Sequence, residues 1–355
     1  MIRKELLLQH SAWMTETDSP VVISSRVRLA RNLEDFPFPH ALSPEGAGQV
    51  EQAIAQVLTD QEGNREQLLY ISLTELNNIE HQVLVEKHLI SPSLGGSTGA
   101  RGVALAPDHR YAVMVNEEDH LRVQVLLSGN QLLETHRLAT DLDDRLEAKL
   151  DFAYRENQGY LTACPTNVGT GLRASIMVHL PGLVITNQVQ QVLGALTRLG
   201  LAVRGLYGEG SQAFGHIFQV SNQITLGKSE EDILTHLDAV TRQIVEHELQ
   251  ARELLQRQMP TLLEDKVWRA RGTLQNARLL SSEDAIHLLS HDRLGSDMGI
   301  LPKIKDSFAT LIVNTRSGCL QYILDRELDA NQRDEERARL IRGSMHEARG
   351  SINEA

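Results

Sequence analysis

The sequence predicts an α/β protein of the α+β type, in which an antiparallel sheet flanked by helices precedes a small all-α region. Two observations support this fold class. Apolar and polar residues alternate in several short runs between helical patterns, and strand signals nearly vanish beyond residue 259.

Residues 101–129 predict an antiparallel meander, because three apolar runs follow one another across short polar turns. Its strands are expected at 103–106, 111–116 and 121–127. Further strands are expected at 172–178, at 217–221 and in or beside the run that holds Arg204. Because successive side chains of a strand point to opposite faces, the polar residues of these runs share one sheet face.

Amphipathic helices are predicted between these strands and after them. Before residue 259 they are expected at 45–58, 132–150, 187–199 and from Ser229 to about 258, where Ser229 and Asp232 are spaced as a capping box. Met259-Pro260 interrupts the last of them, and helices follow at 264–280, 282–289, 307–324 and 331–341. We therefore expect a large domain of residues 1–258 and an all-α domain of residues 259–355.

Composition limits the class of protein. The chain has 355 residues, of which 41% are apolar and 23% charged, enough for one large or two moderate domains. With no signal peptide and no run approaching ~20 apolar residues, we expect a cytoplasmic protein with no membrane partner. Two cysteines are too few for a disulfide framework, and a formal net charge of -12 disfavours direct nucleic-acid binding.

The common nucleotide-binding motifs are absent from the sequence. The Gly-Lys-Ser at 227–229 has Asn222 where a P-loop requires its first glycine, and neither H-R-D nor D-F-G occurs. Two G-x-G-x-x-A strings, at 169–174 and 208–213, lack the parallel strand of a dinucleotide fold. Any phosphoryl chemistry therefore needs another scaffold.

A set of arginines lies on or next to the predicted strands. Their guanidinium forks can hold phosphate oxygens bidentately and stay charged at any accessible pH. They are Arg26, Arg28, Arg122, Arg173 and Arg204. Any one of these arginines, taken alone, could instead be a partner in a surface ion pair. Five of them that converge could hold a triphosphate.

Four segments that contain these arginines resemble, in order, the signature segments of the phosphagen (ATP:guanidino) kinase family. They read S-S-R-V-R-L-A-R-N at 24–32, N-E-E-D-H-L-R at 116–122, C-P-T-N-V-G-T-G-L-R-A-S at 164–175 and R-G-L-Y-G-E at 204–209. The resemblance covers roughly residues 20–255. It implies a sheet of about eight antiparallel strands flanked by helices.

The resemblance also implies the cofactors, ATP and Mg²⁺, with the metal bridging phosphates and held mostly by phosphate and water. Its nucleotide-binding positions correspond here to Ser24, Ser25, Arg26, Val27, Arg28, His88, Arg122, Arg173, Ala174, Ser175, Ile176, Met177, Arg204, Gly205, Leu206, Tyr207, Gly208 and Glu209. His88 lies in a less distinctive segment, where a surface histidine is an equal alternative.

A guanidinium has a pKa of ~12.5 or higher, so an enzyme must remove a proton from it before it can attack phosphorus. The family's two guanidinium-clamping carboxylates correspond to Glu118, which we expect to be the base, and Glu209, its orienting partner. Either could take the proton. Cys164 matches a thiol near the acceptor, with a buried apolar role as the alternative.

The acceptor is predicted from the ends of the chain. Small-molecule members carry a helical domain before the first arginine motif, whereas here the motif begins at Ser24 and the extra residues follow 260, as in the bacterial protein-arginine kinases. That branch's R-D-x-x-R-A motif, which binds phosphoarginine as an allosteric signal, corresponds to Arg333, Asp334, Arg337 and Ala338. A solvated helix face is the alternative.

The resemblance thus implies phosphorylation of exposed arginines in proteins, including a heat-shock repressor, and a link to Clp-protease degradation. It further implies a zinc-finger activator protein and a homodimer formed through the C-terminal domain. A small-molecule guanidino kinase and a non-catalytic phosphoarginine-binding adaptor remain the alternatives.

Overall fold

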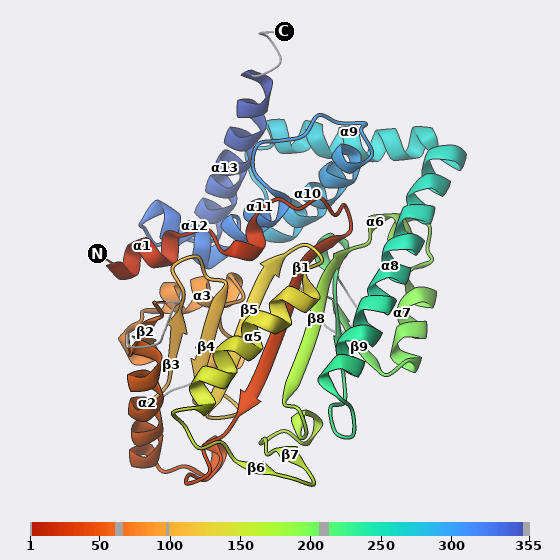
Figure 1. Ribbon diagram of the computed structural model, residues 1–355. Helices are drawn as coiled ribbons and strands as arrows, with labels where there is room; N and C mark the ends of the chain where they lie inside the picture. Colours follow the sequence, from red (N-terminus) through yellow and green to blue (C-terminus); the bar gives the residue numbers. More distant parts are fainter. Residues whose placement is uncertain (1, 61–66, 97–98, 206–212, 351–355) are drawn as a thin grey trace. The chain divides into compact units, whose positions relative to one another are not determined.

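The structure is a computed structural model that describes residues 2–60, 67–96, 99–205 and 213–350. Its central element is an eight-stranded antiparallel sheet in the order β2-β3-β4-β5-β1-β8-β10-β9 (Figure 1), as predicted. Its strands are β1 (Val22–Arg31), β2 (Leu69–Ser72), β3 (Gly102–Leu105), β4 (Tyr111–Val115), β5 (Leu121–Ser128), β8 (Leu172–His179), β9 (Leu201–Gly205) and β10 (Ile217–Asn222). A separate two-stranded sheet consists of β6 (Tyr154–Arg155) and β7 (Gly159–Tyr160).

The predicted meander is confirmed as β3, β4 and β5. The register places Val103 opposite Met114, and Met114 opposite Arg122. In the turn between β3 and β4, the Arg110 amide donates to the Asp108 carboxylate at 3.0 Å. This side-chain acceptor closes the turn, as aspartate commonly does.

Polar residues gather on one face of the sheet. The register of β1 and β5 places Arg28 opposite Gln124 and Ala30 opposite Arg122. Because residues two apart in a strand share a face, Arg26, Arg28, Arg122 and Gln124 project from the same side. We call this side the arginine face, and it includes Arg173 and Ser175 of β8, since Arg26 Nε lies 3.4 Å from Ser175 Oγ.

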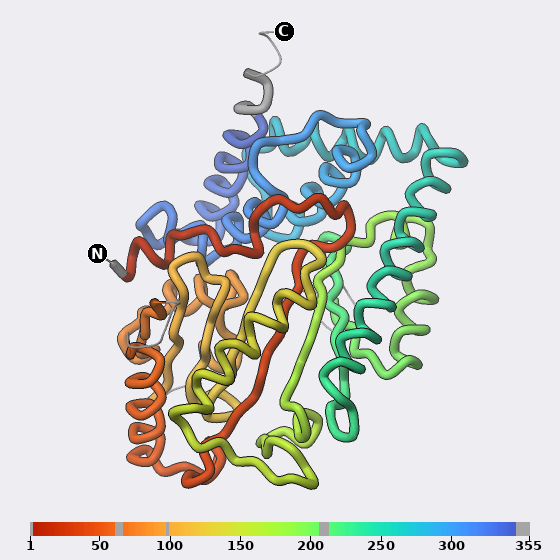
Figure 2. The backbone as a smooth tube through the Cα atoms, viewed as in Figure 1, coloured from red at the N-terminus to blue at the C-terminus, as the bar shows by residue number. Residues whose placement is uncertain are grey.

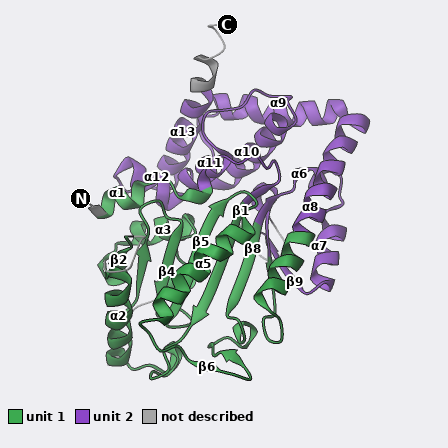
Figure 3. Cartoon of the chain, in the orientation of Figure 1, with its two compact units in different colours: residues 1–13, 24–176, 221–239 green, residues 14–23, 177–220, 240–355 purple. Residues whose placement is uncertain are grey.

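The chain forms two compact units (Figure 3), and Figure 2 traces the course of the backbone through them. Unit 1 comprises residues 1–13, 24–176 and 221–239, and unit 2 comprises residues 14–23, 177–220 and 240–355. Unit 1 contains the helices α1 (Ile2–Leu8), α2 (Pro44–Thr59), α3 (Asn78–Glu86), α4 (Pro92–Gly95) and α5 (Leu132–Glu147). The short 3₁₀ helices of the chain are η1 (Ala12–Met14), η2 (Pro39–Ala41), η3 (Leu73–Glu75), η4 (Pro165–Asn167) and η5 (Phe214–His216).

Unit 2 is mainly helical. It contains α6 (Pro181–Ile185), α7 (Val189–Arg198), α9 (Pro260–Asn276), α10 (Ser282–Asp297), α11 (Phe308–Asn314), α12 (Ser317–Leu324) and α13 (Ala330–Gly350), while α8 (Glu230–Gln258) has residues in both units. Apolar side chains of Leu255, Leu263, Val267, Leu294 and Leu301 form one of its core clusters.

Local sequence determines where α8 begins and ends. At its start the Asp232 amide donates to Ser229 Oγ at 3.0 Å, so the predicted capping box is confirmed. At its end Met259 separates α8 from α9, which starts with Pro260, a residue that lacks the amide hydrogen a continuous helix needs. The division into domains at residue 258 stays a prediction.

The single helix predicted at 307–324 is wrong. Residues 308–314 and 317–324 form separate helices, because Arg316 is extended, with φ -69° and ψ 157°, and acts as the N-cap residue of α12. Ser317 and Gly318 follow it, and both residue types favour helix ends over helix interiors. Among the described helices, none is both long and apolar enough to cross a membrane.

Candidate active site

Four arginines crowd the arginine face of unit 1. Arg26 and Arg28 are half-buried on β1, Arg122 is 8% exposed on β5, and Arg173 stands on β8. Burial, followed by the charges of Arg173 and Arg122, lowers the pKa of Arg26 to about 10. Burial, followed by the charges of Arg26, Arg122 and Arg173, holds the pKa of Arg28 well below its usual value. A bound polyanion would relieve this repulsion.

The buried Nε of Arg28 has no hydrogen-bond partner within the described part of the chain. A buried donor of this kind is costly to leave unpaired, and an acceptor on a bound ligand would satisfy it. Phosphate oxygens match both the charge and the geometry of guanidinium donors. The structure thus brings together four of the five predicted phosphate-binding arginines.

Two neighbouring glutamates bind the same arginine. Glu117 is buried, pairs with Arg122 Nη1 and accepts a hydrogen bond from Ser91 Oγ at 2.6 Å. Burial alone would raise the pKa of Glu117, but the Arg122 charge and the Ser91 hydrogen bond hold it below the usual value. Glu118 accepts from Arg122 Nη2 at 2.9 Å, and its side chain is 46% exposed. Glu118 is therefore the carboxylate that a substrate can reach.

Asp119, the third acid of this segment, is fully buried. Its Oδ1 accepts hydrogen bonds from Asn32 Nδ2 and from the Ala163 amide, both at 2.7 Å. Burial raises its pKa, and these two donors oppose the increase. Asn32 in turn accepts from the His120 amide at 2.9 Å. Sequence reasoning did not assign Asn32 or Asp119 a role, although both stand inside the quoted signature segments.

Cys164 follows directly after Ala163, so Asp119 ties the cysteine segment to the glutamate segment. The cysteine is half-buried at the start of η4, with Sγ 3.0 Å from Thr166 Oγ1. The predicted Glu118 and Cys164 thus occupy segments joined by one hydrogen bond. Cys319 is 2% exposed, as expected for a cysteine of an apolar helix.

His88 follows α3 in a left-handed backbone conformation, with φ 60°. Its amide donates to the Val85 carbonyl at 3.0 Å and the Leu89 amide donates to the Leu84 carbonyl at 2.9 Å. This hydrogen-bond pattern is a Schellman cap, in which glycine is the usual residue at the left-handed position. A side chain there costs about 1–2 kcal/mol.

The other predicted nucleotide-binding residues of unit 1 make contacts within the protein, and their part in nucleotide binding stays a prediction. Ser25 Oγ donates to the Gly129 carbonyl at 2.8 Å and accepts from the Gln131 amide at 2.9 Å, so it stabilises a turn. The Ala174 amide donates to Asn222 Oδ1 at 2.8 Å. Ser24, Val27 and Ile176 are buried in β1 and β8.

Met177, Arg204 and Gly205 belong to unit 2, on β8 and β9. Leu206, Tyr207, Gly208 and Glu209 lie outside the described residues. Across residues 2–60, 67–96, 99–205 and 213–350, no three His, Cys, Asp or Glu side chains are grouped as metal ligands.

The predicted phosphoarginine-binding residues lie on α13. Arg337 is 1% exposed, and its guanidinium donates to the carbonyls of Thr315 at 2.7 Å and Leu280 at 2.6 Å. It also contacts Asp334 Oδ1 at 2.5 Å. Arg333 is half-buried and donates to the Leu328 carbonyl at 2.7 Å, while Ala338 is fully buried. Both arginines therefore bind backbone carbonyls, and their phosphoarginine role stays a prediction.

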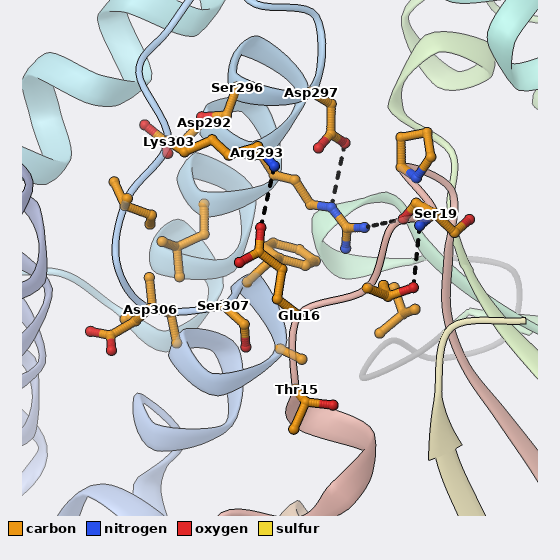
Figure 4. A pocket seen from close by; sticks show the side chains of 18 of the residues that line it. Thr15, Glu16, Ser19, Asp292, Arg293, Ser296, Asp297, Lys303, Asp306 and Ser307 are labelled. Carbon is orange, nitrogen blue, oxygen red and sulfur yellow. Dashed lines mark hydrogen bonds and ion pairs between the residues drawn. The ribbon is translucent and has the colours of Figure 1, made fainter.

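A cavity of about 540 Å³ lies wholly within unit 2 (Figure 4). Arg293 projects into it from α10, with its guanidinium over the Phe308 ring and 3.5 Å from Asp297 Oδ2. Glu16 and Lys303, which both line the cavity, form an ion pair at 3.4 Å. None of the residues that the sequence predicted for the site lines this cavity.

The family model of the ATP:guanido phosphotransferase C-terminal catalytic domain matches residues 49–251. A solved lombricine kinase shares the fold, with a TM-score of 0.56 and 24% identity over 66% of this chain and 68% of that one. The duplicated taurocyamine kinase of Schistosoma mansoni, solved with transition-state analogue components, aligns with a TM-score of 0.58 at 25% identity over 75% of this chain and 40% of that one. The fold and the arginine face are those of an ATP-dependent phosphotransferase with a guanidino acceptor.

A second family model, the protein-arginine kinase McsB C-terminal domain, matches residues 260–355. The protein-arginine kinase of Moorella thermoacetica is 50% identical over 343 residues, which is 95% of this chain and 97% of that protein. The protein-arginine kinase of Bacillus subtilis is 46% identical over 340 residues, 95% of this chain and 93% of that protein. The chain belongs to the bacterial protein-arginine kinases of the ATP:guanido phosphotransferase family.

Proposed function

We propose that this protein transfers the γ-phosphoryl group of ATP to arginine side chains of other proteins. One observation carries the proposal: the half-exposed Glu118 carboxylate is held by Arg122 at the arginine face. Arg122 therefore both contacts the proposed proton acceptor, Glu118, and belongs to the proposed polyphosphate site. The relatives named protein-arginine kinase, which align over about 95% of the chain, support a protein-borne acceptor.

The arginine face binds the triphosphate in this proposal. Arg26, Arg28, Arg122 and Arg173 neutralise phosphate oxygens, and a transferring phosphoryl group needs mainly such positioning and charge stabilisation. Arg204 would add a fifth cation. Magnesium, when bound, would be held largely by phosphate and water rather than by protein side chains, and it would neutralise charge on the transferring phosphoryl group.

Glu118 acts on the acceptor. Its carboxylate takes one proton from the arginine guanidinium, and the freed nitrogen lone pair forms the N–P bond while the bond from γ-phosphorus to the bridging oxygen breaks and ADP leaves. Cys164 and Glu209 would orient the guanidinium. Asp119 fixes the spacing between the Glu118 and Cys164 segments through the Ala163 amide.

Our further proposals about location, targets, activator and assembly rest on the resemblance to the family. They include a cytoplasmic location, a heat-shock repressor among the targets, delivery to the Clp-protease system, a zinc-finger activator and a homodimer. Phosphoarginine would bind at Arg333, Asp334, Arg337 and Ala338.

Acceptor choice is directly testable. The protein is incubated with Mg-ATP and either free arginine or an arginine-rich protein, and acid-labile phosphate is mapped by mass spectrometry. Phosphoarginine in the protein acceptor is the expected result. Transfer to free arginine alone would instead identify a small-molecule guanidino kinase, and no transfer to either acceptor would favour a binding adaptor.

A further inference from the structure

A groove of about 360 Å³ lies within unit 1, close to the segment that contains Cys164. It is lined by the β6–β7 hairpin, by Gly169 and Thr170, and by residues between 225 and 230, which lead into α8. Figure 1 shows the hairpin at the end of the sheet where β8 begins. None of the residues that the proposed phosphoryl transfer uses lines this groove, so its presence needs a separate explanation.

Hydrogen bonds connect the groove to the segment of Cys164. Thr225, which lines the groove, is 1% exposed, and its Oγ1 donates to the Val168 carbonyl at 2.7 Å and contacts the Thr166 carbonyl at 3.1 Å. Thr166 Oγ1 in turn lies 3.0 Å from Cys164 Sγ. The groove is thus held next to the cysteine that the proposed function places beside the acceptor guanidinium.

Two glycines bring the backbones around the groove close together. Gly159 has φ 78°, and a Cβ at this position would collide with the Gly169 carbonyl. Gly169 has φ 114°, and a Cβ there would lie 3.1 Å from the Thr225 carbonyl oxygen. Both positions therefore require glycine. The Tyr160 amide donates to the Gly169 carbonyl at 2.8 Å, so backbone contacts fix the shape of the groove before any ligand binds.

Apolar side chains of the groove are exposed on a rigid support. The Arg31 guanidinium lies 3.5 Å from the centroid of the Tyr160 ring, and the Tyr160 hydroxyl donates to Glu147 Oε1 at 3.1 Å. Tyr154 packs edge-on against Tyr160, with 5.3 Å between the ring centroids, and is 48% exposed. Leu226 is 55% exposed. Large apolar side chains that share one exposed groove are typical of a binding surface.

We propose that this groove binds the polypeptide that flanks the acceptor arginine, with an apolar side chain of the substrate packed against Tyr154 and Leu226. The inference rests on the proposed function, in which an arginine of another protein reaches Glu118. An extended chain spans about 3.3–3.6 Å per residue, so a side chain within about four positions of the arginine can reach the groove. Free arginine has no such flanking residues.

The charges of the groove also fit a polypeptide better than a nucleotide. Glu156 and Glu230 line it together with Lys228, so acidic groups outnumber basic ones. This balance disfavours a polyphosphate and separates the groove from the arginine face.

The test uses acceptor peptides that differ only beside the arginine. One peptide has a single arginine among glycines and serines, and its companions carry one leucine two, three or four positions before or after that arginine. Phosphoarginine formation by the full-length chain with Mg-ATP gives kcat and KM for each peptide. At least one leucine peptide should have a KM about tenfold lower than the glycine peptide, because its leucine leaves water on binding, while kcat stays similar.

Tyr154→Ala and Leu226→Ala should each weaken this preference. The KM of the leucine peptide should rise toward that of the glycine peptide, while kcat, the KM of the glycine peptide and the Kd of Mg-ATP stay unchanged. A disturbed active site would instead affect both peptides alike. Tyr154→Phe keeps the ring and should retain the preference. Leu133→Ala is the matched control, because Leu133 is a 67% exposed leucine on α5 of unit 1 and does not line the groove.

Several outcomes contradict the inference. Equal kcat/KM of the wild-type chain for glycine and leucine peptides would overturn it, as would a preference that survives in both alanine variants. Equal weakening of the two kinds of peptide in these variants would leave Tyr154 and Leu226 with a structural role only. A wild-type chain that phosphorylates neither peptides nor an arginine-rich protein would defeat the proposed function together with this inference. Phosphorylation without any preference for flanking residues would defeat this inference alone.

Discussion

Three consecutive acidic residues, Glu117, Glu118 and Asp119, are placed in three different environments. Glu117 is buried against Arg122 and Ser91, and Asp119 is buried against Asn32 and the Ala163 amide. Glu118 alone of the three keeps a side chain that is 46% exposed. A carboxylate reacts with a substrate only if the substrate can reach it, and the two buried neighbours fix the backbone on either side of it.

Glu118→Gln should separate chemistry from nucleotide binding. The amide can still accept a hydrogen bond from Arg122, but it cannot take a proton from the acceptor. We expect turnover to fall by about 10²–10⁴-fold with little change in the Kd of ATP. Single-turnover phosphorylation and calorimetry measure the two quantities, and a variant with near-normal turnover would assign the proton to another residue.

Asp119→Ala should weaken both stability and turnover. It leaves one Asn32 Nδ2 hydrogen and the Ala163 amide without their acceptor, while Asn32 Nδ2 keeps its bond to the Leu161 carbonyl, and this costs about 1–3 kcal/mol of unfolding free energy. Turnover should fall as well, because the Glu118 and Cys164 segments lose their common anchor. Urea unfolding and steady-state kinetics test this, with Asp35→Ala, at an exposed position, as the control. Normal turnover in a destabilised variant would restrict Asp119 to a structural role.

At the scale of elements, α13 is attached through a buried arginine. Arg337 binds carbonyls that precede α10 and α12, so one side chain fixes three helices of unit 2. Its pKa is lowered by burial, while Asp334 acts in the opposite direction. Any phosphoarginine site on this helix face therefore shares an arginine with the packing of the helices.

Arg337→Ala is expected to lower the free energy of unfolding by about 2–4 kcal/mol, since it removes charged hydrogen bonds from a buried position. Loss of phosphoarginine binding in that variant would then be ambiguous. Arg333→Ala is the better probe, because Arg333 is half-buried. Arg339→Ala is a matched control, with a side chain that is 66% exposed. Equal unfolding midpoints for Arg337→Ala and Arg339→Ala would contradict the anchoring role.

A buried histidine pair connects β8, η5 and α10. Ser290 Oγ lies 2.8 Å from His179 Nε2 and 2.8 Å from His216 Nδ1. Burial, followed by the charges of His291, His287 and Lys266, lowers the pKa of His216 to about 3. His179 behaves in the same way, and burial is again the main cause. Both rings are therefore neutral in the folded chain near pH 7.

Stability should consequently fall in mild acid. In the unfolded chain a histidine binds its proton near pH 6.5, so between pH 6.5 and about 3 the unfolded state holds more protons than the folded state. The contribution of neutral His216 is present above pH 6.5 and declines by about 1.4 kcal/mol per pH unit below it. Urea unfolding at pH 7 and pH 5 should show a smaller decline for His216→Gln, and identical declines would contradict the assignment.

At the scale of the whole molecule, a polyanion should stabilise the chain because the arginine face repels itself when empty. A ligand at 100 times its Kd adds about 2.7 kcal/mol, which for a chain of this size raises Tm by a few degrees. Differential scanning fluorimetry with Mg-ATP measures the shift, and hydrogen exchange should slow in β1, β5 and β8. No shift at saturating nucleotide would contradict binding at this face.

Periodicity was enough to predict the meander, the long helix α8 with its capping box and the break at Met259. These features depend on residues close in sequence. The roles of Asp119 and Thr225 depend on partners 44 and 57 residues away, at Ala163 and Val168, and no local pattern encodes them. The arginines could be singled out from their places on the predicted strands, but their assignment to a phosphate site depends on the resemblance of their segments to a known family.

The two compact units are interleaved along the chain, and this has a consequence for synthesis. Unit 1 needs residues 221–239, so its fold cannot be completed while the ribosome is still translating the stretch that follows residue 24. At about 5–20 residues per second, roughly 10–40 s separate the synthesis of the first arginine strand from that of the last segment of its unit. During that interval the nascent chain carries strands of unit 1 whose partners have not yet been made, which makes early chaperone contact more important for this protein than for one built from consecutive domains.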